Sequence, residues 1–386
     1  MCEVLLPCTY QPKESLDDGH TPLFTTLLLR CWQREYDQRP YRDFRFKRLE
    51  FEERMRRKFH CVRDFRVIVN YLLSRRLRSV TITGVVVSNW DANLLKDFVR
   101  SLIPLSSIHL NLMRLPSEFF AMLCLNAKKM DVMELCLDGT PLSDEDVRLL
   151  REFLLVSKTL RGLSVNHCSL TQYNFALIAD GLHKSERVSC FSANRLLGGY
   201  LSLDTEKIMS MVGSVLMQNR LWSLRLELCE LTAQDMIPIA EHLARRKSKL
   251  QQLRLANNKI GPDGVLFLLR GNIDGGGYLE LLDISSNSIG THGGEWVAKY
   301  LSLSLMLKDL FLTNNDIGAE AINRILTSRR KCCHLERLTL YGNHFDADSA
   351  RIVRRLLDAK VMLQTELDIT FTYDEDLQEY RVIPWR

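Results

Sequence analysis

The pattern that decides the fold reads Leu250-Gln251-Gln252-Leu253-Arg254-Leu255-Ala256-Asn257-Asn258-Lys259-Ile260. It has the form Leu-x-x-Leu-x-Leu-x-x-Asn-x-Ile, and further copies begin at Leu279, Leu307 and Leu335, at intervals of 29, 28 and 28 residues. Weaker copies begin at Leu221, Val188, Leu160, Val132, Leu105 and Leu77, and Leu363 falls on the same register downstream. So many starts near one period are not a chance arrangement of leucines, and they predict an array of stacked structural repeats.

Each position of the pattern has a physical reason. Two alternating apolar residues, such as Leu253 and Leu255, point to the same side of a short strand, while the residue between them faces the other side. Stacked copies therefore predict a parallel sheet. The asparagine at position 258 and its equivalents can bond the backbone of the loop that leaves the strand. Cys168 and Cys229 occupy this position in earlier copies, where we expect buried packing residues rather than reactive thiols.

The rest of each repeat predicts a helix. In one copy Thr232 and Asp235 can form a capping box, and apolar residues follow at helical spacing from Met236 to Leu243. Ile322, Ile325 and Leu326 repeat the spacing in a later copy.

A period near 28 with a full helix in each unit resembles the leucine-rich repeats of the ribonuclease-inhibitor type. This resemblance implies an α/β fold, a leucine-rich-repeat solenoid or horseshoe with a parallel inner sheet and outer helices. We predict three regions, which are an N-terminal basic helical cap at 1–76, the solenoid at 77–362, and a C-terminal capping strand and tail at 363–386.

Two irregularities interrupt the array. The step from Val188 to Leu221 is longer than the others, and the surplus near residues 197–201 predicts a protruding loop. The triplet Gly275-Gly276-Gly277 is predicted to be a turn from helix to strand, because no phosphate-binding GxxxxGK pattern follows it.

The N-terminal region does not fit the repeat and is rich in cations. They include Arg39, Arg42, Arg45, Lys47, Arg48, Arg54, Arg56, Arg57 and Lys58, interleaved with Phe44, Phe46, Leu49, Phe51, Met55 and Phe59. An amphipathic helix that caps the first repeat is the preferred interpretation. A site for an acidic partner, RNA or a membrane surface is the alternative, because clustered arginines also bind phosphates.

Composition limits the remaining classes of function. The chain of 386 residues has 26% charged residues, no apolar run near 18 residues, no evident secretory signal, and 11 cysteines without CxxC spacing. We therefore expect a cytoplasmic protein, with the nucleus as a second location. We expect no enzyme, cofactor or metal, because His109 and His167 are isolated on the inner face and the adjacent Cys332-Cys333 suits packing better than zinc.

The C-terminus carries a second resemblance. The stretch from Leu163 to Ile260 resembles the protein phosphatase 1 regulatory subunit 37 family. Residues 369–376, Ile-Thr-Phe-Thr-Tyr-Asp-Glu-Asp, with the terminal Pro-Trp-Arg, look like the phosphatase-docking segment of that family. The resemblance implies that Ile369 and Phe371 would dock. The alternative is a terminal repeat strand, because Leu367 and Ile369 fit the strand pattern one residue out of register.

The outward-facing strand residues form the predicted partner site. They are Arg225, Glu227, Arg254, Asp283, Phe311, Thr339 and Tyr341, with Phe311 and Tyr341 as anchors because aromatic residues flanked by charge are typical of binding hot spots. The sequence therefore predicts a non-enzymatic protein-interaction scaffold, with protein phosphatase 1 as one candidate partner. The alternative is a regulator of a small GTPase, by analogy with the Ran GTPase-activating protein.

Overall fold

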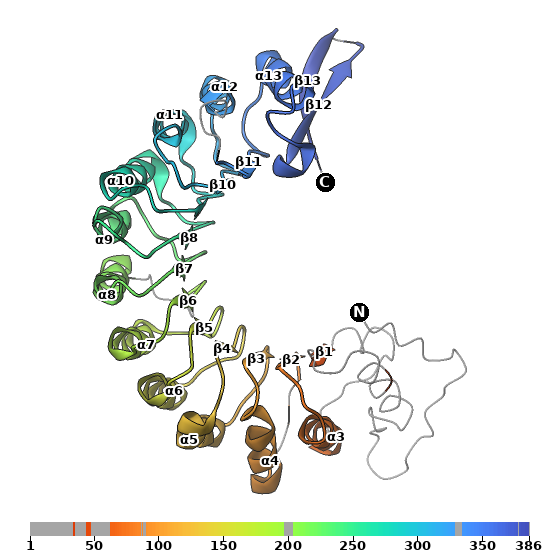
Figure 1. Cartoon of the computed structure of the whole chain (residues 1–386), viewed down its shortest axis with the longest axis vertical. Helices are drawn as coiled ribbons and strands as arrows, with labels where there is room; N and C mark the ends of the chain where they lie inside the picture. The colour runs from red at the N-terminus through yellow and green to blue at the C-terminus, as the bar shows by residue number, and fades with distance from the viewer. Residues whose placement is uncertain are drawn as a thin grey trace. The chain divides into compact units, whose positions relative to one another are not determined.

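The computed structural model describes residue 34 and residues 44–47, 62–85, 87, 90–196, 204–328, 334–376 and 378–385. The chain divides into two compact units. Unit 1 runs as far as Leu170 and includes residues Lys184–Arg187, and unit 2 holds Thr171–His183 and everything from Val188 onward. In each unit short strands lie side by side in chain order, and helices cover one face of the sheet (Figure 1).

Unit 1 alternates strands and helices from its first described strand. The order is β1 (Phe44–Lys47), α3 (Val62–Leu73), β2 (Ser79–Thr83), α4 (Ala92–Leu102), β3 (Ser107–Asn111), α5 (Ser117–Asn126), η1 (Ala127–Lys129), β4 (Glu134–Cys136), α6 (Asp144–Val156) and β5 (Gly162–Ser164). Each strand pairs in parallel with the next.

Unit 2 continues the same alternation and ends differently. It holds α7 (Gln172–Lys184), β6 (Cys190–Ser192), α8 (Thr205–Met217), β7 (Ser223–Arg225), η2 (Gln234–Met236), α9 (Ile237–Leu243), β8 (Gln252–Arg254), α10 (Gly261–Asp274), β9 (Leu281–Asp283), α11 (Gly290–Leu301), β10 (Asp309–Phe311), α12 (Ala319–Ser328), β11 (Arg337–Thr339), α13 (Ala347–Asp358), η4 (Gln364–Glu366), β12 (Ile369–Asp374) and β13 (Glu379–Pro384). Strands β6 to β11 are parallel.

The predicted strand positions are confirmed. Every strand from β2 to β11 begins two residues after a repeat start, from Leu77 to Leu335. Leu310 in β10 and Leu312 directly after it are buried, whereas Phe311 between them is not. The alternation that the sequence shows is therefore the alternation between core and surface.

Buried asparagines join successive repeats of unit 2. The amide of Asn315 donates to the carbonyl oxygens of Ile284 (2.9 Å) and Leu312 (3.0 Å), and its own oxygen accepts from the backbone N–H of Asn287 (2.7 Å). The buried Asn258 and Asn287 and the half-buried Asn343 bond in the same way. The predicted role of this position is confirmed, because each amide satisfies backbone groups that leave the strand.

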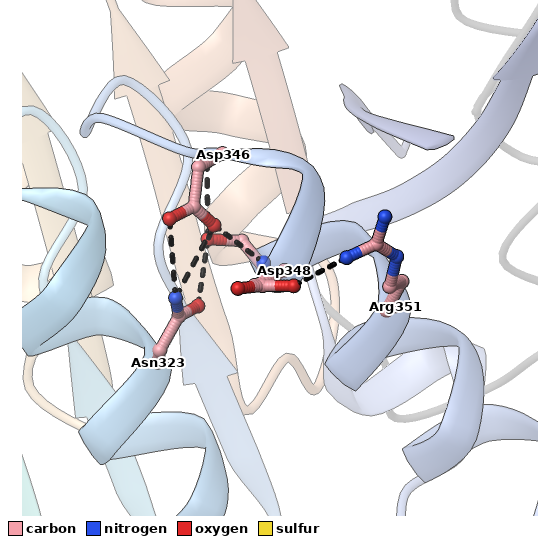
Figure 2. Close-up of polar contacts among 5 residues, drawn as sticks. Asn323, Asp346, Asp348 and Arg351 are labelled. Carbon is pink, nitrogen blue, oxygen red and sulfur yellow. Dashed lines mark hydrogen bonds and ion pairs between the residues drawn. The ribbon is translucent and has the colours of Figure 1, made fainter. Parts of the chain in front are cut away.

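The start of α13 shows how the helices are fixed locally and to one another. The carboxylate of Asp346 caps α13 by accepting from Ser349 N (2.7 Å), and it also accepts from the amide of Asn323 on α12 (3.2 Å), as Figure 2 shows. Ser349 Oγ donates to Asn323 Oδ1 (2.7 Å). In the same first turn Asp348 pairs with Arg351 (2.6 Å). The cap of one helix is thus bound to the next helix.

The predicted capping box in the earlier copy is present in part. The Asp235 carboxylate accepts from both the backbone N–H (2.7 Å) and the hydroxyl (2.8 Å) of Thr232. A short 3-10 turn, η2, follows before α9 begins. Among the described residues no helix is both long enough and apolar enough to traverse a bilayer.

The N-terminal segment differs from the prediction at residues 44–47. These residues form strand β1, which pairs in parallel with β2, so the prediction of a helix across them is wrong. Phe44 and Phe46 fit the alternation of a strand as well as the apolar stripe of a helix. The open edge of β2 supplies the hydrogen bonds that favour the strand. The other cations from Arg39 to Lys58 lie outside the described residues, apart from Arg45 and Lys47 in β1.

The C-terminal segment is a hairpin rather than one closing strand with a tail. Leu367 forms a parallel bridge with Leu338, which continues the repeat register with the offset of one residue that the sequence predicts. The chain then turns away, and β12 pairs antiparallel with β13. Ile369 is fully buried, and Arg354 of α13 lies over the ring of Tyr380, 4.8 Å from its centroid. The hairpin therefore covers α13, the last helix of the array.

The remaining irregularities have separate outcomes. Gly276 and Gly277 have positive φ angles of 108° and 71° in the turn from α10 to β9, as predicted for the triplet. The surplus segment at 197–203 and the pair Cys332-Cys333 lie outside the described residues.

Candidate functional site

The exposed side of the sheet in unit 2, opposite the helices, brings most of the predicted partner residues together. We call it the strand face. The strand register places five of them in one row across β7 to β11, namely Arg225, Arg254, Asp283, Phe311 and Thr339. Glu227 and Tyr341 lie two residues further along the chain, and therefore on the same side. Arg225 and Tyr341 are exposed, and the others are half-buried.

Phe311 lies at the centre of a charged group. The guanidinium carbons of Arg254 and Arg337 lie 5.6 Å and 6.0 Å from its ring centroid, within the range of cation–π attraction. Each arginine also faces a carboxylate, Arg254 at 3.6 Å from Asp283 and Arg337 at 3.7 Å from Asp309. The ring and the two guanidinium groups thus form a preorganised surface with both apolar and charged parts.

Glu227 adds a carboxylate whose charge is only partly balanced. Burial raises its pKa, the nearby Asp283 raises it further, and Arg225 and Arg254 oppose this effect. The backbone N–H of Glu227 donates to Asn194 Oδ1 (2.9 Å), which holds the chain in place after β7. A cationic group of a partner would stabilise the ionised form of this carboxylate.

Tyr341 has a fixed backbone and an exposed ring. Its N–H donates to Asp368 Oδ2 (3.0 Å), and Leu340 N donates to the other oxygen of the same carboxylate (2.7 Å). Burial raises the pKa of Asp368, although these bonds lower it. The tyrosine side chain is 47% exposed. A ring held on a rigid backbone loses little entropy on binding, which is the property of an anchor.

Sequence reasoning missed two members of this surface. Asp309 and Arg337 lie two residues before Phe311 and Thr339, so the alternation that selected the latter pair also places them on the strand face. The signal was therefore present in the sequence. What it did not contain was the stacking of Arg337 on Phe311, which depends on side chains from two different repeats.

The exposed side of the sheet in unit 1 contains a histidine with polar neighbours. Ser107 Oγ lies 2.8 Å from His109 Nε2 and donates to Glu134 Oε2 (3.1 Å), while Glu134 lies 3.5 Å from the same ring nitrogen. A nucleophilic relay needs the carboxylate on one ring nitrogen and the hydroxyl on the other, so this geometry does not form one. His167 is exposed in the loop after β5. The two histidines are not brought together by the strand register.

Three buried cysteines are protonated at neutral pH, namely Cys168 and Cys229 at the repeat position of the asparagines and Cys136 in β4. Burial raises the pKa of Cys229 to about 11 and that of Cys136 to about 12, and it also raises the pKa of Cys168. Cys168 and Cys229 point their sulfur atoms at backbone carbonyl oxygens, as predicted for packing residues. No group of side chains with the composition of a metal site occurs in the part of the chain that the structure describes.

Comparison with known proteins agrees with the repeat geometry. A family model described as "Leucine Rich repeat" matches residues 246–269. The chain is a leucine-rich-repeat solenoid. It is 29% identical over 255 residues to the ribonuclease inhibitor of Sus scrofa, covering 57% of this chain and 54% of that protein. It is also 29% identical over 220 residues to the human NACHT, LRR and PYD domains-containing protein 5, covering 56% of this chain and 18% of that protein.

A solved structure adds a more distant likeness. An internalin of Listeria monocytogenes matches with a TM-score of 0.43 and 19% identity, covering 77% of this chain and 68% of the internalin chain. The solenoid spans about half the length of the porcine inhibitor. The predicted likeness to the ribonuclease-inhibitor type is supported, whereas the likeness to the phosphatase 1 regulatory subunit 37 family stays a prediction.

Proposed function

We propose that this protein is a non-enzymatic interaction scaffold and that the strand face of unit 2 contacts its protein partner. One observation carries the proposal, namely Phe311 stacked between two guanidinium groups in a row that ends near the exposed ring of Tyr341. Aromatic and arginine side chains dominate the energy of protein interfaces, because they combine large contact area with directional polar groups.

The rigidity of the site supports this proposal. The row is formed by five adjacent strands in fixed register, and its backbone is held by the buried asparagines behind it. A partner would therefore meet a surface that is already ordered, and the entropic cost of binding would fall mainly on the partner. The similarity to proteins named ribonuclease inhibitor is consistent with a binding role.

The test is the double variant Phe311→Ala/Tyr341→Ala. Partners retained by the full chain are identified by affinity purification and mass spectrometry, and their affinities are then measured with purified proteins. We expect at least about a 30-fold loss of affinity, since a hot-spot residue contributes roughly 2 kcal/mol or more. Tyr173→Ala, an exposed tyrosine on α7, is the matched control and should leave binding unchanged. If the double variant binds every partner as tightly as the unmodified protein does, the proposal is refuted.

The narrower hypotheses stay predictions. Phosphatase docking through Ile369 and Phe371 would require release of the hairpin, because Ile369 is fully buried and Asp368 bonds the backbone of Leu340. A peptide covering residues 364–386 tests the intrinsic affinity for phosphatase 1, and the full chain tests whether the hairpin opens. Regulation of a small GTPase is tested by a hydrolysis assay with the full chain. We also propose a cytoplasmic and nuclear location, which a fluorescent fusion would test.

A further inference from the structure

Four connections from helix to strand lie along one edge of unit 2. They are residues 217–222, 244–249, 274–278 and 302–306, which include the last residue of α8 and of α10 and lead into β7, β8, β9 and β10, and we call them the loop edge. Asn219 joins the first two loops, because its amide donates to the carbonyl oxygen of Lys247 (3.1 Å) and its oxygen accepts from Lys249 N (2.9 Å). Residues about 30 positions apart in the sequence are thereby placed side by side.

The glycine triplet connects the third loop to its neighbours. A Cβ at Gly275 would overlap the carbonyl oxygen of Leu243, which directly precedes the second loop. A Cβ at Gly277 would lie 3.9 Å from both Leu303 O and Leu305 N of the fourth loop. Gly277 has a φ angle of 71°, which side chains rarely adopt. Gly275 thus allows the second and third loops to approach closely, the third loop lies against the fourth at Gly277, and the loop edge is one continuous surface.

Large apolar side chains are exposed along the loop edge. Between 40% and 64% of each is exposed, for Met217, Trp222, Tyr278, Leu303, Leu305 and Met306. Single exposed apolar residues are ordinary on proteins, but Leu303, Leu305 and Met306 lie within one loop, whose backbone lies beside Gly277, the residue before Tyr278. Such a cluster gains free energy when something apolar covers it.

The second loop adds positive charge to the same edge. Arg245, Arg246, Lys247 and Lys249 are all exposed, and none of them forms an ion pair with another described residue. Two acidic residues close to the loops in sequence face cations of their own. Asp274 faces Arg270 at 3.6 Å, and Glu280 faces Lys308 at 2.8 Å. The loop edge therefore has an excess of positive charge beside its apolar cluster.

We propose that the loop edge docks on a membrane surface that contains anionic phospholipids. Leu303, Leu305 and Met306 would enter the interface between headgroups and acyl chains, where Trp222 and Tyr278 are also favourable. The four cations would lie against the phosphates, where each contributes a modest attraction that falls off with salt. Apolar insertion and charge act together, because peripheral binding by either one alone is weak.

The observations favour a lipid surface over a nucleic acid. Bases bind to aromatic faces and cations, whereas aliphatic side chains such as Leu303 and Leu305 provide neither stacking nor hydrogen bonds. A row of adjacent loops also suits a flat surface, which all four can contact at once. Binding here is independent of the strand face, so the double variant Phe311→Ala/Tyr341→Ala should bind vesicles like the unmodified protein.

The test is co-sedimentation of the full chain with phosphatidylcholine vesicles, with and without phosphatidylserine. Binding should require phosphatidylserine and decline with salt. The variant Arg246→Gln/Lys249→Gln should bind about 25-fold more weakly, at roughly fivefold for each charge. The variant Leu303→Ser/Leu305→Ser should lose at least about tenfold. Matched controls on other surfaces, Lys259→Gln/Arg355→Gln and Leu228→Ser, should retain binding, and circular dichroism should show that every variant is folded.

Several results would overturn the proposal. One is the absence of sedimentation with phosphatidylserine vesicles. Another is undiminished binding by both loop-edge variants, which would assign the affinity to another basic part of the chain. A third is binding of single-stranded RNA that Arg246→Gln/Lys249→Gln abolishes while vesicle binding is absent. A fourth is loss of a protein partner on Leu303→Ser/Leu305→Ser without any vesicle binding, which would make the loop edge a protein interface.

Discussion

At the scale of the residue, each buried asparagine should make a large contribution to the free energy of unfolding. Asn315 is fully buried and makes three strong bonds to backbone groups of two repeats. Asn315→Ala would leave those groups unsatisfied, and we expect a loss of about 3 kcal/mol in the free energy of unfolding. Chemical denaturation measures the loss. Glu336→Ala, on the surface before β11, is the control and should change stability by less than about 0.5 kcal/mol.

His242 gives unit 2 a predictable dependence on pH. It is buried in α9, both ring nitrogens lack a hydrogen-bond partner among the described residues, and burial with the nearby Arg245 lowers its pKa to about 4. Between pH 6.5 and 4 the unfolded chain binds a proton that the folded protein does not. The free energy of unfolding therefore keeps its full value above pH 6.5. As the pH falls towards 4, the titration of His242 lowers it by on the order of 3 kcal/mol. In His242→Leu this decline should largely disappear, and an unchanged pH profile of unfolding would contradict the assignment.

At the scale of the element, the C-terminal hairpin has one face that packs and one that does not. Ile369 is fully buried, whereas Ile383 is 39% exposed and lies opposite Thr370 on the other face of the hairpin. Ile369→Ala should therefore lower the free energy of unfolding by about 2 to 4 kcal/mol. Ile383→Ala removes the same atoms from the exposed face and should cost far less. Equal effects of the two variants on thermal unfolding would show that the hairpin does not cover the array.

The hairpin also explains why the last strands have two plausible interpretations in the sequence. The docking hypothesis rests on the alternation of Ile369 and Phe371, and the repeat-strand hypothesis rests on the alternation of Leu367 and Ile369. The structure places them in an antiparallel pair, Ile369 opposite Pro384 and Phe371 opposite Val382. The partner strand is supplied by residues that the sequence marked only as a tail.

At the scale of the whole molecule, stability should vary along the array. Each repeat contacts only its neighbours, so the interior repeats of unit 2 have a partner on both sides. The terminal hairpin has open edges. Amide hydrogen exchange should therefore be slowest in β8 to β10, for example at Leu253 and Leu310, and faster at Val382 in β13. Uniform protection across unit 2 would instead indicate that it unfolds in one step.

The sequence by itself determined the repeat, its period and the side of each strand that is buried. These features depend on local spacing, since a strand alternates every two residues and a helix places every third or fourth residue on one face. The row from Arg225 to Thr339 follows from the same spacing, and so does the role of Asn258 and its equivalents. A pattern repeated many times is robust because errors in single copies do not shift the register.

Tertiary structure alone decided the features that join distant parts of the chain. Phe44–Lys47 form a strand because the edge of β2 supplies hydrogen bonds. Residues 379–384 form a strand because β12 supplies hydrogen bonds to them. Arg337 meets Phe311, and the loop of Lys247 meets that of Asn219, through side chains of different repeats. Such contacts depend on how successive repeats stack, and stacking distances are not encoded in any single stretch of sequence. The physical reason is that local spacing fixes which way a side chain points, whereas only the packed array fixes what it meets.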